Sequence, residues 1–425
     1  MMCLRPFLSI ALIFVLCFGV ESCKDKKMNV LPINKNKSAA EFLGHSEYRA
    51  MSYGGYRTLT RDDQPSISQI KEDLKILSAI GVKVIRTYNL QLDQAPNILK
   101  AIRALRSEDA SFEMYVMLGL WMECENARQS PNHVVEDIAV NSAEIERAII
   151  YSNQYPDIVK IIAVGNEAMV HWQTDYFVAP SVILKWVNYL QKLKTEDKLP
   201  SALWITSSDN FASWGGGGSE YHNEDLESLM KAVDYISVHT YPFHDTHYNP
   251  VFWKLEDVNL FDNKLDAIDH AMKKAVDYQY AQFLSVKNYM QSIGIQKDIH
   301  IGETGWASIA TDLYGDEGTH AADEYKQSIY FDLTTKLCNS LKISCFYFSA
   351  FDEPWKDSSN QSGSENHFGL FTVEGKAKYA LWSSVDSGLF KGLGRNGIDV
   401  QKTYDGNKED LIKMVQPPLS YISEQ

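Results

Sequence analysis

The sequence contains little cysteine and no cluster of residues that would bind a metal. Only six of its 425 residues are cysteines, and three of these lie within the first 23 positions. The other three, Cys124, Cys338 and Cys345, cannot all pair with one another. Cys338 and Cys345 could form one local disulfide, although buried thiols are the favoured interpretation. No spacing of cysteine and histidine resembles a zinc site, so we expect no metal.

Positive charge is scarce relative to negative charge. Lysine and arginine number 41 against 55 aspartates and glutamates, which gives a formal net charge of −14 at pH 7. An acidic surface repels phosphate groups, and this argues against nucleic acid or an anionic lipid surface as a partner. No glycine-rich phosphate loop is found either, which disfavours a nucleotide-binding fold.

No apolar run at the amino terminus is long enough to span a bilayer comfortably. The run Pro6–Val20 follows Arg5 and ends in small residues, which predicts a signal peptide over residues 1–22 rather than a retained transmembrane helix. The four residues ending at Cys23 resemble a bacterial lipobox, in which the cysteine is lipidated; ordinary cleavage with a free Cys23 is the alternative. Residues 23–45 would then be a flexible tether.

These features predict an exported lipoprotein that reaches a membrane only through its lipid anchor. The outer membrane, the cell surface and the periplasmic face all remain open as its location.

Apolar and aromatic residues are abundant. Hydrophobic residues make up 45% and aromatic residues 12% of the chain, which is ample for a large core. The 23 tyrosines and nine tryptophans also suit sugar binding, because the CH faces of pyranose rings pack on aromatic faces. Most of these side chains are nevertheless expected in the core.

Eight short β-rich segments alternate with amphipathic segments between residues 46 and 390. This alternation predicts an α/β fold, most economically a (β/α)8 TIM-type barrel, with an open doubly wound sheet as the alternative. The predicted strands are Tyr48–Tyr53, Val82–Tyr88, Phe112–Leu120, Val159–Val164, Ala202–Ser207, Tyr235–Thr240, Asp298–Gly302 and Ile343–Phe348. The predicted helices are Ser66–Ile80, Ala95–Leu105, Val134–Tyr151, Pro180–Lys192, Asn223–Ala232 and Thr319–Ser340.

Two segments fall outside this regular alternation. Pro242–Lys297 is a long insertion between the sixth and seventh strands, at the face of a barrel where enzymes bind their substrates. Residues 391–425 contain no strand that would continue the barrel, so we expect them to pack on its outside or to be partly disordered.

Two glutamates directly follow predicted strands four and seven. Asn166 and Glu167 follow the apolar segment Ile161–Gly165, and Glu303 follows Ile299–Gly302. A single glutamate at a strand end means little, because charged residues are common where a strand reaches water. Retaining glycosidases, however, need two carboxyls about 5 to 5.5 Å apart, one as nucleophile and one as acid/base. The pair therefore predicts such a site.

Four segments together resemble glycoside hydrolase family 17, over about residues 48–385: Val164–Glu167, Ile301–Trp306, Phe351–Lys356 and His367–Phe371. The resemblance implies that Glu167 is the acid/base, that Glu303 is the nucleophile, and that Asn166 hydrogen-bonds the 2-hydroxyl of the sugar at the cleavage point. Such a hydrogen bond tightens in the transition state and so contributes to rate.

The same resemblance implies roles for three further residues. Tyr241, at the end of strand six, matches a tyrosine that donates a hydrogen bond to the nucleophile; a buried aromatic at the rim is the alternative. Glu353 and Lys356 match a charge pair on the eighth loop, which could tune the acid/base and bind a hydroxyl. A plain surface ion pair is the alternative there.

Weaker expectations concern four other residues near strand ends. Arg86 and Tyr88 end strand two, and Arg86 is expected to support the nucleophile from below. Trp121 and Trp306 are candidate platforms for sugar rings, with ordinary packing as the alternative.

The implied substrate is a β-1,3-glucan such as laminarin, as polysaccharide or oligosaccharide, cut internally by a monomer without any cofactor. Three alternatives remain open from the sequence. The substrate could be a mixed-linkage β-1,3/1,4-glucan, the glycosyl unit could be transferred to another sugar, or the chain could be a non-catalytic glycan-capture protein. The last is disfavoured because both glutamates are present.

Overall fold

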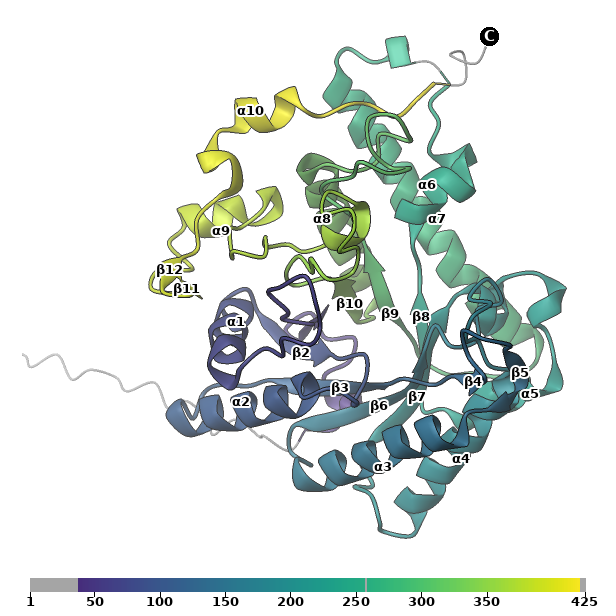
Figure 1. Cartoon of the computed structure of the whole chain (residues 1–425). Coiled ribbons are helices and arrows are strands. Elements are labelled where there is room, and N and C mark those ends of the chain that lie inside the picture. Colours follow the sequence, from purple (N-terminus) through teal and green to yellow (C-terminus); the bar gives the residue numbers. More distant parts are fainter. Residues whose placement is uncertain (1–36, 257, 421–425) are drawn as a thin grey trace, which may run out of the picture. The chain divides into compact units, whose positions relative to one another are not determined.

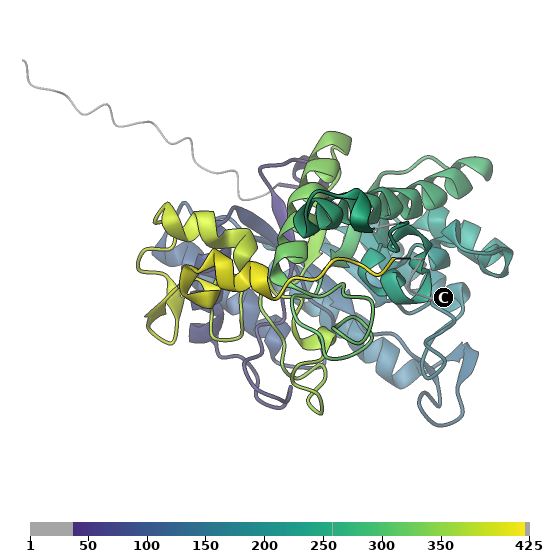
Figure 2. The same ribbon diagram turned by 90° about the horizontal axis from the view of Figure 1, so that it is seen from above.

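The computed structural model describes residues 37–256 and 258–420, and within them eight parallel strands close into a barrel (Figures 1 and 2). The order around the barrel is β1-β10-β9-β8-β7-β6-β3-β2. The predicted TIM-type barrel is therefore confirmed, and every barrel strand overlaps its predicted segment. The barrel strands are β1 (Arg49–Ser52), β2 (Val82–Arg86), β3 (Tyr115–Leu120), β6 (Val159–Asn166), β7 (Trp204–Asn210), β8 (Ile236–His239), β9 (Ile299–Gly305) and β10 (Cys345–Phe348).

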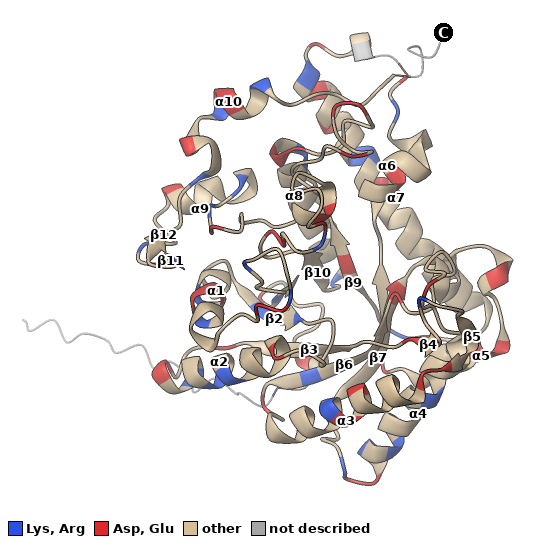
Figure 3. Ribbon diagram, viewed as in Figure 1, with Lys and Arg blue, Asp and Glu red and all other residues tan. Residues whose placement is uncertain are grey.

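Helices surround the barrel on its outside (Figure 1). Several begin at a polar side chain that accepts hydrogen bonds from the first-turn N–H groups, as Ser66, Asn223 and Asp323 do for α1, α5 and α8. Figure 3 shows both signs of charge spread over these helices, whereas the strands carry few charges. The helices are α1 (Ile67–Ala79), α2 (Gln94–Glu108), α3 (Ile138–Gln154), α4 (Pro180–Thr195), α5 (Glu224–Ala232), α6 (Pro242–Tyr248), α7 (Lys264–Ser292), α8 (Glu324–Leu341), α9 (Trp382–Asp386) and α10 (Lys408–Lys413).

The predicted helix Val134–Tyr151 begins too early. Residues Asn132–Glu136 form strand β5, which pairs antiparallel with β4 (Cys124–Glu125). The helix starts only after Asp137, whose side chain accepts hydrogen bonds from two first-turn N–H groups. The β-branched Val134 and Val135 suit the strand better than a helix.

The amino-terminal mouth of the barrel is closed by a short 3-10 helix, η1 (Ala39–Glu41), and the residues after it. The ring of Phe42 is fully buried and stacks on Tyr115 inside the barrel, with centroids 5.0 Å apart. The predicted flexible segment 23–45 is therefore too long, because Ala39, Phe42 and Leu43 belong to the core. The rest of that segment up to residue 36, including Cys23, and the predicted signal peptide over residues 1–22 lie outside the described residues.

The carboxyl-terminal segment packs against the barrel domain as far as it is described. It contains the small hairpin of β11 (Gly394–Arg395) and β12 (Ile398–Asp399), and it buries Leu411 and Val415. The guanidinium of Arg395 forms a fully buried ion pair at 2.7 Å with Asp73 of α1. This pair ties the segment to the first helix of the barrel.

The three cysteines of the described residues, Cys124, Cys338 and Cys345, all carry free thiols. None of the helices described there is both long enough and apolar enough to cross a membrane.

Candidate active site

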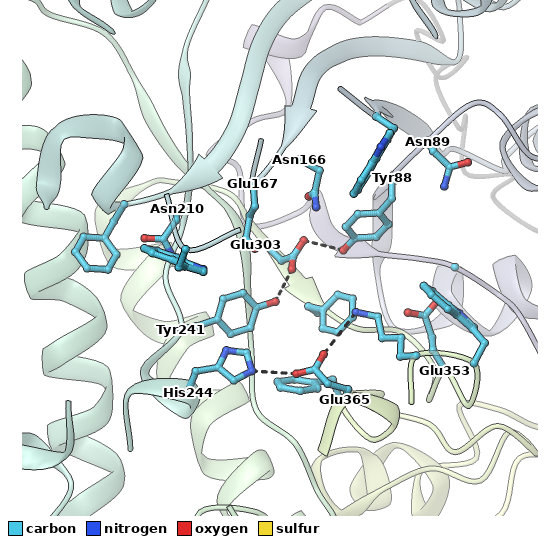
Figure 4. Close-up of a pocket in the computed structure, with 18 of the residues that line it drawn as sticks. Tyr88, Asn89, Asn166, Glu167, Asn210, Tyr241, His244, Glu303, Glu353 and Glu365 are labelled. Atoms are coloured by element: carbon cyan, nitrogen blue, oxygen red, sulfur yellow. Dashed lines mark hydrogen bonds and ion pairs between the residues drawn. The ribbon is translucent and has the colours of Figure 1, made fainter. Parts of the chain in front are cut away.

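A cleft of about 810 Å³ opens at the carboxyl ends of the barrel strands, and it gathers most of the predicted site residues (Figure 4). Glu167 reaches it from the end of β6 and Glu303 from β9. The predicted residues that line it are Tyr88, Trp121, Asn166, Glu167, Tyr241, Glu303, Glu353 and Lys356.

Glu303 is held by three donors. Its Oε1 accepts a hydrogen bond from the Tyr241 hydroxyl at 2.6 Å, and its Oε2 accepts from Tyr88 at 2.9 Å and from the Arg86 guanidinium at 2.5 Å. Figure 4 shows the two tyrosines approaching the carboxylate from opposite sides. Burial alone would raise the pKa of Glu303, but the charge of Arg86 above all, followed by His239, Lys356 and the Tyr241 hydrogen bond, brings it down to about 2. The carboxyl is therefore ionised at neutral pH.

Arg86 lies beneath the nucleophile candidate, as expected from the sequence. Its side chain is fully buried at the end of β2, and it also donates to the carbonyl of Gly302 at 2.8 Å and to Oδ1 of Asn166.

Burial raises the pKa of the Tyr241 phenol well above its usual value, and the neighbouring Glu303 carboxylate raises it further. Tyr241 therefore keeps the proton that it donates.

Glu167 has a different environment. Its side chain is 24% exposed to the cleft, and its carboxyl oxygen Oε1 lies 3.0 Å from Nδ1 of His239. His239 is the one side chain recorded as a hydrogen-bond partner of this carboxyl among the residues that the structure describes. The backbone of Glu167 lies in the left-handed region, with φ of 44°, directly after Gly165 and Asn166. Such strain in a non-glycine residue is typical of functional sites.

A buried carboxyl fixes the loop that follows Glu167. Asp209, at the end of β7, accepts hydrogen bonds from the N–H groups of Met169 at 2.9 Å and Asn210 at 2.8 Å. The N–H of Glu167 itself donates to the carbonyl of Ser208 at 3.0 Å. Burial raises the pKa of Asp209 to about 7, partly offset by these N–H donors. The end of β7 thus orients the whole turn that carries Glu167.

For the predicted charge pair of Glu353 and Lys356, the structure corrects the ion-pair partner of Lys356. Both residues line the cleft, but the ammonium of Lys356 pairs with Glu365, at 3.9 Å, and Glu365 also contacts His244 at 3.2 Å. Glu353 is buried beside Gly54, where even a Cβ atom would lie 1.6 Å from its Oε1. Burial raises the pKa of Glu353, although Lys356 opposes the shift.

Only one of the two predicted sugar platforms faces the cleft. Trp121 lines it, with its indole N–H donating to Glu123 at 3.0 Å. The expectation for Trp306 is wrong: its side chain is fully buried, and its indole N–H donates to the carbonyl of Ala321 at 2.8 Å. The chain turns away from the cleft after β9, so this ring packs under α6 against Phe243.

Several lining residues were not singled out from the sequence. The cleft also contains the exposed ring of Trp172, together with Trp355, Asp245 and Glu365. The Glu167 contact His239 was missed too, although a signal for it existed. Successive side chains of a strand point to opposite faces, so His239 and Tyr241, two positions apart, fall on the same side.

Comparison with known proteins agrees with this geometry. Residues 50–369 match the BtgE/BtgC glycoside hydrolase domain. The chain is 56% identical to an endo-laminarinase from Formosa Hel1_33_131, whose crystal structure superposes with a TM-score of 0.89, covering 90% of this chain and 98% of the other.

Two fungal relatives are more distant. A glucan 1,3-beta-glucosidase of Arthroderma benhamiae is 25% identical over 328 residues, covering 73% of this chain and 83% of the relative. A probable glucan endo-1,3-beta-glucosidase btgC of Aspergillus flavus is 23% identical, and the match covers 75% of this chain but only 40% of that protein. With a family match over most of the barrel and a close structural relative, the chain belongs to the BtgE/BtgC glycoside hydrolases.

Proposed function

We propose that this glycoside hydrolase cleaves β-1,3-glucan internally and with retention of configuration, with Glu303 as nucleophile and Glu167 as acid/base. One observation carries the proposal: two glutamates from β6 and β9 line a single cleft in opposite environments. Glu303 is fixed as a carboxylate by a cation and two phenols, whereas Glu167 is open to the cleft, and in the described part of the chain its carboxyl has one side-chain hydrogen-bond partner, His239. Such divergence separates a nucleophile from a proton donor.

The reaction then proceeds in two displacements. In the first, Glu303 attacks the anomeric carbon while Glu167 gives its proton to the departing glycosidic oxygen, and a covalent glycosyl-enzyme forms. In the second, the Glu167 carboxylate takes a proton from water, whose oxygen attacks the same carbon and releases Glu303. Two inversions at one carbon restore the β configuration.

In this proposal Asn166 binds the sugar at the cleavage point. Its Oδ1 accepts a hydrogen bond from the Arg86 guanidinium, which fixes the orientation of the amide. The amide NH₂ is then left to donate to the 2-hydroxyl of the sugar. Because this hydrogen bond strengthens as the ring becomes oxocarbenium-like, it lowers the barrier as well as aiding binding.

Laminarin-like β-1,3-glucan is the substrate that the relatives support. The Formosa protein, at 56% identity, is an endo-laminarinase, and the fungal relatives are named for glucan 1,3-β bonds. Aromatic side chains that line the cleft, including Trp121, Trp172 and Trp355, suit the stacking of successive glucose rings.

The product pattern from laminarin tests this proposal. An internally acting hydrolase releases a spread of oligosaccharides from the first time points. Glucose or one fixed oligomer alone would contradict internal cleavage, and products longer than a starting oligomer would favour transglycosylation. A barley-type mixed-linkage glucan, digested in parallel, tests the alternative substrate. No new reducing ends from either glucan would leave only the glycan-capture alternative.

We further propose that Cys23 carries a lipid anchor. Ala39, Phe42 and Leu43 are buried in the core, and all eight strands of the closed barrel follow them in the sequence. The Cys23→Ser variant is therefore expected to leave the membrane fraction and to keep its specific activity on laminarin. Activity that stays membrane-bound in this variant would contradict the lipid anchor.

A further inference from the structure

A row of polar side chains lies behind Glu167, inside the barrel wall. His239 on β8 is fully buried, with Nδ1 at 3.0 Å from Oε1 of Glu167 and Nε2 at 2.8 Å from the hydroxyl of Ser208 on β7. The Ser208 hydroxyl in turn lies 2.9 Å from that of Ser237 on β8. Both serines are fully buried and are partners in the register of β7 and β8. Every polar atom of the imidazole therefore has a partner.

The neighbouring strand leaves space for this row. At Gly302, one residue before Glu303, a Cβ atom would lie 2.1 Å from the Ser237 hydroxyl and 2.5 Å from that of Ser208. Both distances are far below van der Waals contact, so any larger residue would displace the two hydroxyls. The glycine in β9, the strand that carries Glu303, thus leaves room for the two serine hydroxyls behind His239 and Glu167.

The charged groups near the imidazole of His239 are Glu167, Glu303 and Arg86. His239 contacts Glu167 of β6 and is the register partner of Glu303 on β9. The Arg86 guanidinium of β2 pairs with Glu303 on the far side of that carboxylate. Ser208 and Ser237, the contacts from β7 and β8, are neutral.

We propose that His239 is a positioning residue that decides which oxygen of Glu167 carries the catalytic proton. The inference rests on the proposed function. Because a carboxylate only accepts, Nδ1–H donates to Oε1 of Glu167, and the Ser208 hydroxyl, which can donate or accept, is the partner of Nε2. Oε1 is thereby occupied as an acceptor, so the proton leaves from Oε2 in the first displacement and returns to Oε2 in the second.

This arrangement has a measurable consequence. A hydrogen bond to a carboxyl is stronger when the carboxyl is ionised. His239 therefore favours the ionised form of Glu167, which the first displacement leaves and from which the second begins. Its loss should move the basic limb of the pH profile of kcat/KM upward, by about one pH unit. The loss should also slow substrates that need protonation of the leaving oxygen more than activated aryl glycosides, which do not.

A matched pair of variants isolates the Nδ1 contact. Asparagine places an amide nitrogen where the imidazole has Nδ1, whereas glutamine reaches toward the position of Nε2. His239→Asn is expected to keep kcat/KM on laminari-oligosaccharides within about threefold and to leave the basic limb in place. His239→Gln is expected to lose about 10- to 100-fold and to shift the limb upward, while activated aryl β-glucosides load the enzyme at nearly the wild-type rate.

Ser208→Ala provides a second measurement that does not depend on replacing the imidazole. It removes the partner of Nε2, so the imidazole is held less firmly against Glu167, and it is expected to shift the basic limb in the same direction by a smaller amount. Equal behaviour of the asparagine and glutamine variants, or an unshifted limb in both His239→Gln and Ser208→Ala, would overturn the role of His239.

Glu167→Ala distinguishes failure of this inference from failure of the proposed function. The basic limb should be absent in this variant if Glu167 is the acid. If the limb persists, the acid/base assignment is wrong. The basic limb could instead disappear in Glu167→Ala while the basic limb of His239→Gln equals that of the wild type. In that case only the role of His239 is wrong.

Discussion

Replacing Glu303 with glutamine is expected to reduce hydrolysis of laminarin to less than about a hundredth of the wild-type rate. The amide cannot attack the anomeric carbon, and among the described residues that line the cleft no other carboxylate forms an ion pair with a fully buried cation. Glutamine keeps the size of the side chain and can still accept a hydrogen bond from Tyr241. Binding of the polysaccharide is therefore expected to survive, and initial rates should be measured beside a binding assay.

Glu220→Gln is a matched control for this experiment. Glu220 is exposed and lies outside the cleft, so the same chemical change there should leave the rate unaltered. Activity of Glu303→Gln above about a hundredth of the wild type would remove Glu303 from the role of nucleophile.

For Glu167→Ala we expect losses that depend on the leaving group. A sugar leaving group needs a proton and should slow by several orders of magnitude, whereas an activated aryl glycoside should still form the glycosyl-enzyme. Hydrolysis of that intermediate then stalls, because no carboxylate removes a proton from water. Azide needs no such base, and the space left by the side chain, 24% exposed to the cleft in the wild type, admits it. The expected product is a β-glycosyl azide.

Steady-state rates on laminari-oligosaccharides and on an aryl glycoside, with and without azide, check this expectation. Equal losses on both substrates would contradict the assignment of Glu167 as acid/base. An α-glycosyl azide would show instead that azide attacks without a covalent intermediate.

The barrel could be predicted largely because several of its strands are apolar on both faces. Segments such as those of β3 and β6 are buried along almost their whole length, so they appear in the sequence as short continuous apolar runs. The start of α3 could not be predicted as well. An apolar pattern around Val134 fits either a helix or a short strand, and the pairing of β5 with β4 decides between them.

The two glutamates could be placed from the sequence because a strand end determines which way the next side chain faces. Trp306 could not, since its burial depends on contacts with α6 and with Tyr330 of α8, which come from distant segments. The contact of His239 with Glu167 likewise depends on the register between β6, β7 and β8. The partner of Lys356 is set by the fold of the eighth loop, which brings Glu365 back over the cleft.

The most direct test of the central claim is the configuration of the first product. Proton NMR of a laminari-oligosaccharide digest, recorded within minutes at high enzyme concentration, distinguishes the anomers before mutarotation mixes them. Two displacements through Glu303 predict that the β-anomer of the new reducing end appears first and that the α-anomer follows only at the rate of mutarotation. An α-anomer that appears first would show a single displacement by water and would contradict the covalent role of Glu303.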